Sequence, residues 1–169
     1  MNIALIGLGS MGYNLAKNIV SKNYQVNAFE KNMLIVENIK NDNIQNLYLL
    51  NSIQDLVDKT PSPRIIMLSL PADKIDKCIN DLIDHLNPTD IIADLGNSLY
   101  LKSMEREKLL SRFDISFLGI GVSGGPRGAK NGPAIMAGGS INAWENVKNI
   151  FFLNLHLKPA IFVIIHVTM

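Results

Sequence analysis

The stretch "ALIGLGSMGYNLAKNIV", residues 4–20, decides the fold, because it reads as a short buried strand, a glycine turn and a helix. The glycines follow the spacing G-x-G-x-x-G. In such a turn the first glycine permits a tight bend, the second lets a pyrophosphate approach the backbone, and the third lets the helix pack closely on the strand. Amide groups at the helix start then point toward the phosphates. The predicted contacts are Gly7, Leu8, Gly9, Ser10, Met11 and Gly12, with packing as the alternative role for Met11.

The end of the next predicted strand, residues 26–29, bears on the choice of dinucleotide. Glu30 stands where a carboxylate accepts hydrogen bonds from both adenosine ribose hydroxyls and repels a 2′-phosphate. Lys31 follows directly and offers a point charge for that same phosphate. The sequence therefore leaves NAD or NADP open, with Glu30 favouring NAD; a solvated surface glutamate is the remaining interpretation.

Short aliphatic runs alternate with helix-period segments along the rest of the chain. Strands are predicted at 3–6, 26–29, 65–70, 90–94 and 115–118. The clearest amphipathic helix spans 74–86, and Ser52 and Ser140 are predicted to cap helices over 53–58 and 141–152. This alternation predicts an α/β fold of the Rossmann type, a doubly wound and mainly parallel sheet with helices on both faces. We expect one dinucleotide-binding domain over 1–150 and an apolar tail over 151–169.

Composition narrows the class of protein. Sixteen Lys and Arg residues face fifteen Asp and Glu residues, so nothing indicates a nucleic-acid or membrane partner. The lone Cys78 cannot form an internal disulfide, which favours a reducing compartment, and we expect the cytoplasm. Cys78 also lies on an apolar stripe with no activating partner, and the three histidines lack ligand spacing. We therefore expect neither a catalytic thiolate nor a metal site.

A second glycine-rich stretch, "GVSGGPRGAKNGPAIMAGG" at 121–139, predicts another binding surface facing the same cleft. Together with "GLGSMGYNLAKN" and "IIADLGNS" (91–98), it closely resembles the N-terminal domain of the 6-phosphogluconate dehydrogenase family, in order from residue 1 to about 150. Dehydrogenases of the 3-hydroxyisobutyrate type share the first motif and V-S-G-G. They typically carry a Ser-Thr pair where this chain has Gly96-Asn97-Ser98, so that branch is the alternative.

The resemblance implies an activity and further site residues. Family members transfer a hydride from 6-phosphogluconate to NAD(P), usually NADP, and release CO₂ and ribulose 5-phosphate in the pentose phosphate pathway and in gluconate utilisation. Ser123, Gly124 and Gly125 would contact the sugar acid, Asn97 would lie between it and the nicotinamide, and Leu70 and Pro71 would line the cofactor cleft. The alternatives are a turn-stabilising hydroxyl for Ser123 and an Asx-turn for Asn97.

The general base and acid of the family are a lysine and a glutamate in a segment like G-x-G-H-x-V-K-M-V-H-N-G-I-E-Y. This chain instead reads "LHLKPAIFVIIHVTM" over 155–169, so no catalytic residue is assigned, and Lys130 is read as solvated. We expect a reading frame truncated or shifted near 150–158, and dinucleotide binding without efficient turnover. The alternative is a non-catalytic nucleotide-binding fragment. The apolar tail would add an edge strand or promote self-association.

Overall fold

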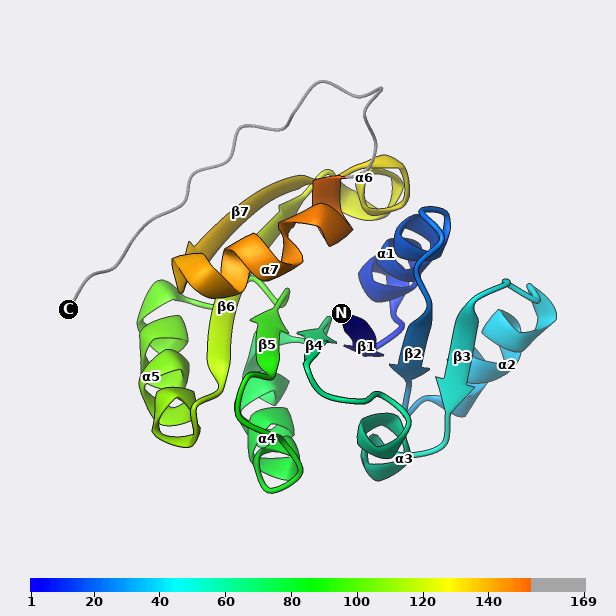
Figure 1. The fold of residues 1–169 in the computed structure, drawn as a ribbon. Helices are drawn as coiled ribbons and strands as arrows, with labels where there is room; N and C mark the ends of the chain where they lie inside the picture. Colours follow the sequence, from blue (N-terminus) through cyan, green and yellow to red (C-terminus); the bar gives the residue numbers. More distant parts are fainter. Residues whose placement is uncertain (153–169) are drawn as a thin grey trace.

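A computed structural model describes residues 1–152, and Figure 1 shows a single twisted sheet between two layers of helices. The strands are β1 (Asn2–Ile6), β2 (Val26–Phe29), β3 (Leu47–Leu50), β4 (Arg64–Leu68), β5 (Ile91–Asp94), β6 (Ser116–Ser123) and β7 (Ala134–Gly139). The helices are α1 (Ser10–Val20), α2 (Met33–Asn41), α3 (Ile53–Asp58), α4 (Ala72–Ile83), α5 (Tyr100–Leu110), α6 (Gly125–Asn131) and α7 (Ile141–Phe152). The expectations for the tail, and for His156 and His166, lie outside the described residues.

The sheet has the strand order β3-β2-β1-β4-β5-β6-β7. Neighbours from β3 to β6 pair in parallel, and β7 pairs antiparallel with residues 118–123 of β6. The predicted α/β fold with a mainly parallel sheet is therefore confirmed. The chain order reverses between β1 and β4, and a reversal of this kind opens a crevice beyond the carboxyl ends of the two strands.

Helices on both faces are also confirmed, and each layer covers its own apolar core. Side chains from α1, α2, α6 and α7 pack on one face, and side chains from α3, α4 and α5 pack on the other. Residues 3–6 of β1 and all of β4 and β5 are buried between these cores. This burial explains their aliphatic runs, because a strand covered on both faces needs no polar alternation.

Several predicted boundaries agree with the structure to within one residue. The predicted strand 115–118 was too short, because β6 continues to Ser123 and pairs there with β7. The hydroxyl of Ser52 accepts a hydrogen bond from the amide of Asp55 at 3.0 Å, so this cap is confirmed. Ser140 caps α7 in the same way, through the amide of Ala143 at 3.3 Å. The predicted strand 65–70 was wrong at its end, because the chain leaves the sheet after Leu68. The predicted helix 74–86 was displaced, because α4 starts directly after Pro71 and ends at Ile83.

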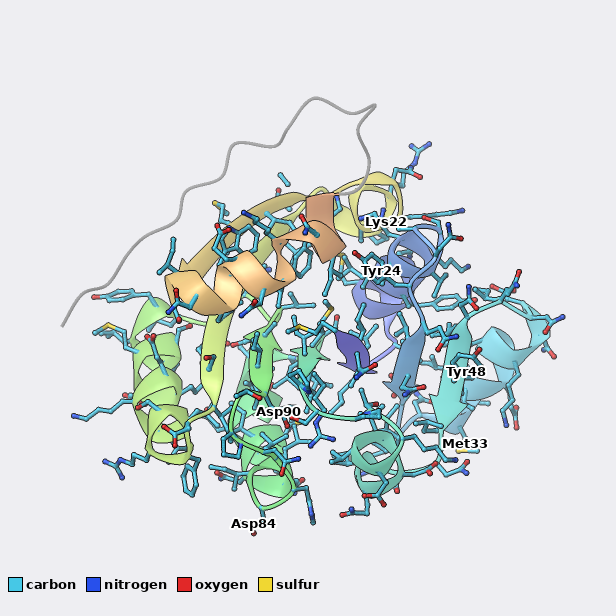
Figure 2. All side chains as sticks on the ribbon, in the orientation of Figure 1. Lys22, Tyr24, Met33, Tyr48, Asp84 and Asp90 are labelled. Carbon is cyan, nitrogen blue, oxygen red and sulfur yellow. The ribbon has the colours of Figure 1, made fainter. Side chains whose placement is uncertain are left out.

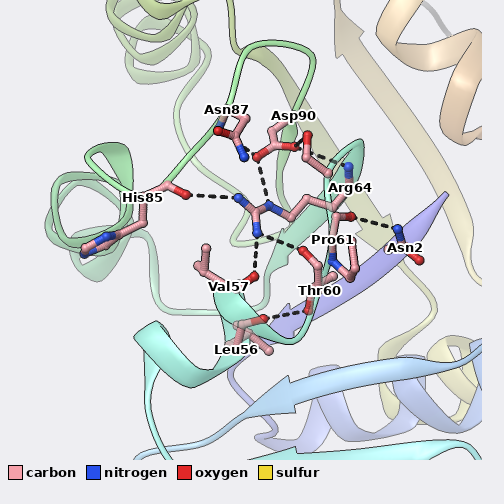
Figure 3. A network of polar contacts seen from close by, with 10 residues as sticks. Asn2, Leu56, Val57, Thr60, Pro61, Arg64, His85, Asn87 and Asp90 are labelled. Atoms are coloured by element: carbon pink, nitrogen blue, oxygen red, sulfur yellow. Dashed lines mark hydrogen bonds and ion pairs between the residues drawn. The ribbon is translucent and has the colours of Figure 1, made fainter.

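The amino edge of the sheet is held by a buried ion pair between Arg64 and Asp90. Asp84 is not part of this ion pair and is the C-cap of α4; Figure 2 labels both Asp84 and Asp90. In Figure 3 the guanidinium of Arg64 donates to Asp90 at 2.8 Å and to the carbonyls of Val57 and Thr60 at 2.6 and 2.8 Å. Since both strands start here, the network lies at the edge opposite the glycine turn. The carboxyl edge is left for binding.

Candidate functional site

The turn between β1 and α1 lies where the strand order reverses. Its first and third glycines are required by the backbone conformation or by close packing. Gly7 adopts a φ of 91°, and a Cβ built on it would lie 2.4 Å from the carbonyl oxygen of Ser69. A Cβ on Gly12 would lie 2.0 Å from the carbonyl oxygen of Gly7. A side chain at either position would therefore push the helix away from the turn or the turn away from β4.

The middle glycine differs from its neighbours. Gly9 is the N-cap of α1 with an ordinary φ of −61°, and no described atom lies within 4 Å of a Cβ built on it. The fold of residues 1–152 therefore gives no packing reason for glycine at this position. Open space over bare backbone, directly before the unpaired amides of a helix start, is the arrangement that a diphosphate requires.

The side chain of Glu30 is bound to the same turn. One carboxylate oxygen accepts a hydrogen bond from the amide of Leu8 at 2.7 Å, and the other accepts from the amide of Asn32 at 2.8 Å. Glu30 is half-buried, whereas Lys31 beside it is exposed. The structure thus brings Glu30 to the glycine turn, in contrast to a freely solvated glutamate. The side chain of Leu8 is buried, so only its backbone faces this contact.

The loops after β4 and β5 lie against each other next to the turn. A Cβ on Gly96 would lie 2.5 Å from the carbonyl oxygen of Leu70, so the two backbones are in close contact. Asn97 follows with a φ of 53° and an exposed side chain. Pro71 is also exposed, and Leu70 packs in part against the core. The structure therefore brings the adjacent residues Leu70 and Pro71 close to the loop of Asn97, which lies more than twenty positions later in the sequence.

The second glycine-rich stretch reaches the same edge and the same face. Ser123 ends β6, Gly124 and Gly125 both adopt positive φ, and all three are exposed. The following helix α6 packs along α1, where the side-chain amide of Asn18 donates to the carbonyl of Lys130 at 2.8 Å. Because both helices start at the carboxyl edge, the two glycine turns lie on one side of the sheet. The stretch is not a plain loop, since it contains α6 and the whole of β7.

A cavity of about 540 Å³ opens between α5 and the β6–β7 pair. Asn97 contributes to its lining, and the glycine turn does not. Much of the lining is apolar, from Tyr100, Met104, Phe117 and Met136. A phosphorylated sugar acid needs closely spaced polar partners, so this cavity does not match the predicted substrate. The exposed surface around Ser123 and Asn97 suits it better.

Other reactive groups stand apart from this edge. Cys78 lies on the buried face of α4, where desolvation raises the pKa of its thiol to about 12. A reactive thiolate is therefore disfavoured at neutral pH. Within residues 1–152 no group of His, Cys, Asp and Glu is arranged to hold a metal ion. The same residues include no helix that is both long and apolar enough to cross a lipid bilayer.

Comparison with known proteins bears on this site. Residues 2–153 match the family model for the NAD-binding domain of 6-phosphogluconate dehydrogenase. The chain is 40% identical over 147 residues to the decarboxylating 6-phosphogluconate dehydrogenase of Buchnera aphidicola, covering 86% of this chain and 31% of that protein. It is 41% identical over 156 residues to the Haemophilus influenzae enzyme of the same name, covering 89% and 32%. The chain thus spans about a third of the length of these relatives.

Solved structures of other proteins share this fold. The 6-phosphogluconate dehydrogenase of Plasmodium falciparum superposes with a TM-score of 0.81 at 34% identity, over 89% of this chain and 33% of that one. Its structures include complexes with its cofactor NADP⁺ and with its substrate 6-phosphogluconate. The 3-hydroxyisobutyrate dehydrogenase of Mycobacterium tuberculosis has a TM-score of 0.83 at 20% identity, over 97% and 54%, which shows a shared fold alone.

Proposed function

The chain belongs to the 6-phosphogluconate dehydrogenase family through its NAD-binding domain, and we propose from this premise that it binds a nicotinamide dinucleotide at the carboxyl edge of β1. The diphosphate lies over Gly9 against the first amides of α1. The open backbone at Gly9 carries this proposal, because no packing within residues 1–152 accounts for a glycine there. The adenosine ribose extends toward Glu30, which is already bound to the turn. The nicotinamide extends toward Pro71 and Asn97.

The substrate in this proposal is a phosphorylated sugar acid, and the reaction is its oxidation by hydride transfer followed by loss of CO₂. Ser123, Gly124 and Gly125 are exposed beside α1 and offer a hydroxyl and main-chain amides without bulky side chains. Asn97 lies between this stretch and the nicotinamide. The 169 residues contain no segment like the one that supplies the family's base and acid, so we expect this chain by itself to bind without efficient turnover. We place it in the cytoplasm.

Titration calorimetry with NAD⁺ and NADP⁺ tests the binding proposal most directly. The informative variant is Gly9→Val, whose side chain fills the space over the turn. We expect binding to weaken at least about tenfold, the equivalent of about 1.4 kcal/mol. We expect the protein to stay folded with only a small loss of stability: valine is a poorer N-cap than glycine, but φ at Gly9 is ordinary and a built Cβ meets no described atom beyond its chain neighbours. Unchanged affinity in a folded Gly9→Val protein would place the ligand elsewhere.

The choice between the two dinucleotides tests the role of Glu30. We expect the chain to bind NAD⁺ more tightly than NADP⁺, because the carboxylate repels a 2′-phosphate. The substitution Glu30→Gln keeps an acceptor for the amide of Leu8 and removes the charge. It should shift the affinity ratio toward NADP⁺ by about tenfold. The matched variant Lys31→Met should lower NADP⁺ affinity alone, and an unchanged ratio in Glu30→Gln would contradict the assignment.

A further inference from the structure

Arg106 is a buried cation at the carboxyl edge of the sheet, with 4% of its surface exposed. Neither the sequence motifs nor the family match assigns it a role. We infer that Arg106 is a positioning residue, which holds the loops after β4 and β5 in the geometry that receives the nicotinamide end of the dinucleotide. The inference rests on the proposed function for its ligand, and on the contacts of residues 72–106 for its geometry.

The guanidinium joins two segments that are separate in the chain, residues 72–76 and residues 94–98. One terminal nitrogen donates to the carboxylate of Asp94 at 2.7 Å and to the hydroxyl of Ser98 at 2.6 Å. The Nε group donates to Asp76 on α4 at 2.6 Å, and the other terminal nitrogen lies 3.4 Å from the carbonyl of Ala72. A single planar cation thus connects the end of β5, the loop that follows it, and the first turns of α4. Lysine has no rigid fork with which to do this.

The loop held in this way contains Asn97. The second oxygen of Asp94 accepts a hydrogen bond from the amide of Gly96 at 2.8 Å. Asp94 therefore binds the loop through one oxygen and Arg106 through the other. Asn97 lies between these fixed points in the left-handed region, with a φ of 53°. Asparagine is one of the few residues besides glycine that adopt this conformation readily, and its surroundings select it here. The contacts of Arg106 supply those surroundings.

The location of Arg106 distinguishes it from the other buried arginine of the described chain. Arg64 and its partners lie at the amino edge, at the opposite end of the strands from the glycine turn. Arg106 instead contacts Ser98, the neighbour of Asn97, and Ala72, the neighbour of Pro71. Asn97 and Pro71 are both predicted to contact the cofactor. A purely structural ion pair has no need to bridge these two loops.

The first test examines the free protein. Hydrogen exchange and the chemical shift of the Gly96 amide report its bond to Asp94. We expect Arg106→Met to increase exchange at this amide, Arg106→Lys to have an intermediate effect, and Lys102→Met, an exposed cation on the same helix, to have none. If Arg106→Met does not fold, Ser98→Ala removes one partner of the guanidinium and should give a smaller change of the same kind. A Gly96 amide unaffected in both variants overturns the inference.

The second test compares NAD⁺ with ADP-ribose, which lacks the nicotinamide. In Arg106→Lys we expect NAD⁺ affinity to fall about three- to thirtyfold more than ADP-ribose affinity, because only the nicotinamide end meets the displaced loop. Equal losses for both ligands would indicate a general structural role and overturn the inference. If the unmodified chain binds neither ligand, the proposed function fails, and the Gly96 exchange still decides whether Arg106 holds the loop.

Discussion

Replacing Asp90 with alanine is expected to lower the free energy of unfolding by about 3–5 kcal/mol. The carboxylate is fully buried and accepts hydrogen bonds from the Nε and backbone amide of Arg64, the hydroxyl of Ser62 and the amide of Asn87. Its removal strands the Arg64 charge at 3% exposure. A buried cation without its counter-ion costs more free energy than the intact ion pair contributes, so we expect a large loss of stability. Urea denaturation of the folded chain measures it.

Three further variants separate the ion pair from general disruption at Asp90. Asp84→Ala removes an exposed carboxylate on the same side of the sheet and should change stability by no more than about 0.5 kcal/mol. Asp90→Asn keeps the shape and loses the charge, so its effect should be smaller than that of alanine. Adding Arg64→Met to Asp90→Ala removes the stranded cation and should restore part of the stability. A loss below about 1 kcal/mol in Asp90→Ala would contradict the argument.

The first glycine turn could be predicted from sequence because its glycine spacing belongs to one strand-turn-helix unit of about fifteen consecutive residues. Gly12 prevents a clash with the carbonyl of Gly7 inside this unit, whereas Gly7 prevents a clash with Ser69 after β4, which the motif alone does not reveal. The caps at Ser52 and Ser140 were predictable for the same reason, since a hydroxyl and an amide three residues later are enough to define them. Local chemistry of this kind does not depend on the rest of the fold.

Elements with a weak pattern could not be predicted in this way. The edge strand β3 is only half-buried, and its four residues, LYLL, include no β-branched side chain to indicate a strand. The buried residues of α5 are Arg106 and Leu110, which do not form an apolar stripe. The glycines of β7 and α6 suggest a loop, although antiparallel pairing with β6 and packing on α1 order both segments. In each case tertiary contacts supply what the local sequence lacks.

The same distinction applies to the site. Glu30 could be identified from its distance to the first motif, because the βαβ unit determines which residue ends the second strand. The role inferred for Arg106 was not predictable, since arginine at an interior position of a polar helix usually indicates a solvated face. Only its contacts with Asp94, Ser98 and Asp76 distinguish it from the exposed Lys102 on the same helix. A role that depends on a buried charge and its loop contacts can be recognised only in the three-dimensional structure.

Gly12→Ala should lower the stability of the fold and abolish dinucleotide binding together. Alanine normally favours a helix over glycine by about 1 kcal/mol. Here its Cβ would lie 2.0 Å from the carbonyl oxygen of Gly7 and 3.0 Å from the side chain of Ser69, so α1 must move away from the turn. We expect a net loss of about 3 kcal/mol in urea denaturation and no detectable heat with NAD⁺. Gly9→Val, in contrast, should weaken binding with only a small loss of stability. An unchanged denaturation midpoint in Gly12→Ala would show that the helix does not pack against the turn as described.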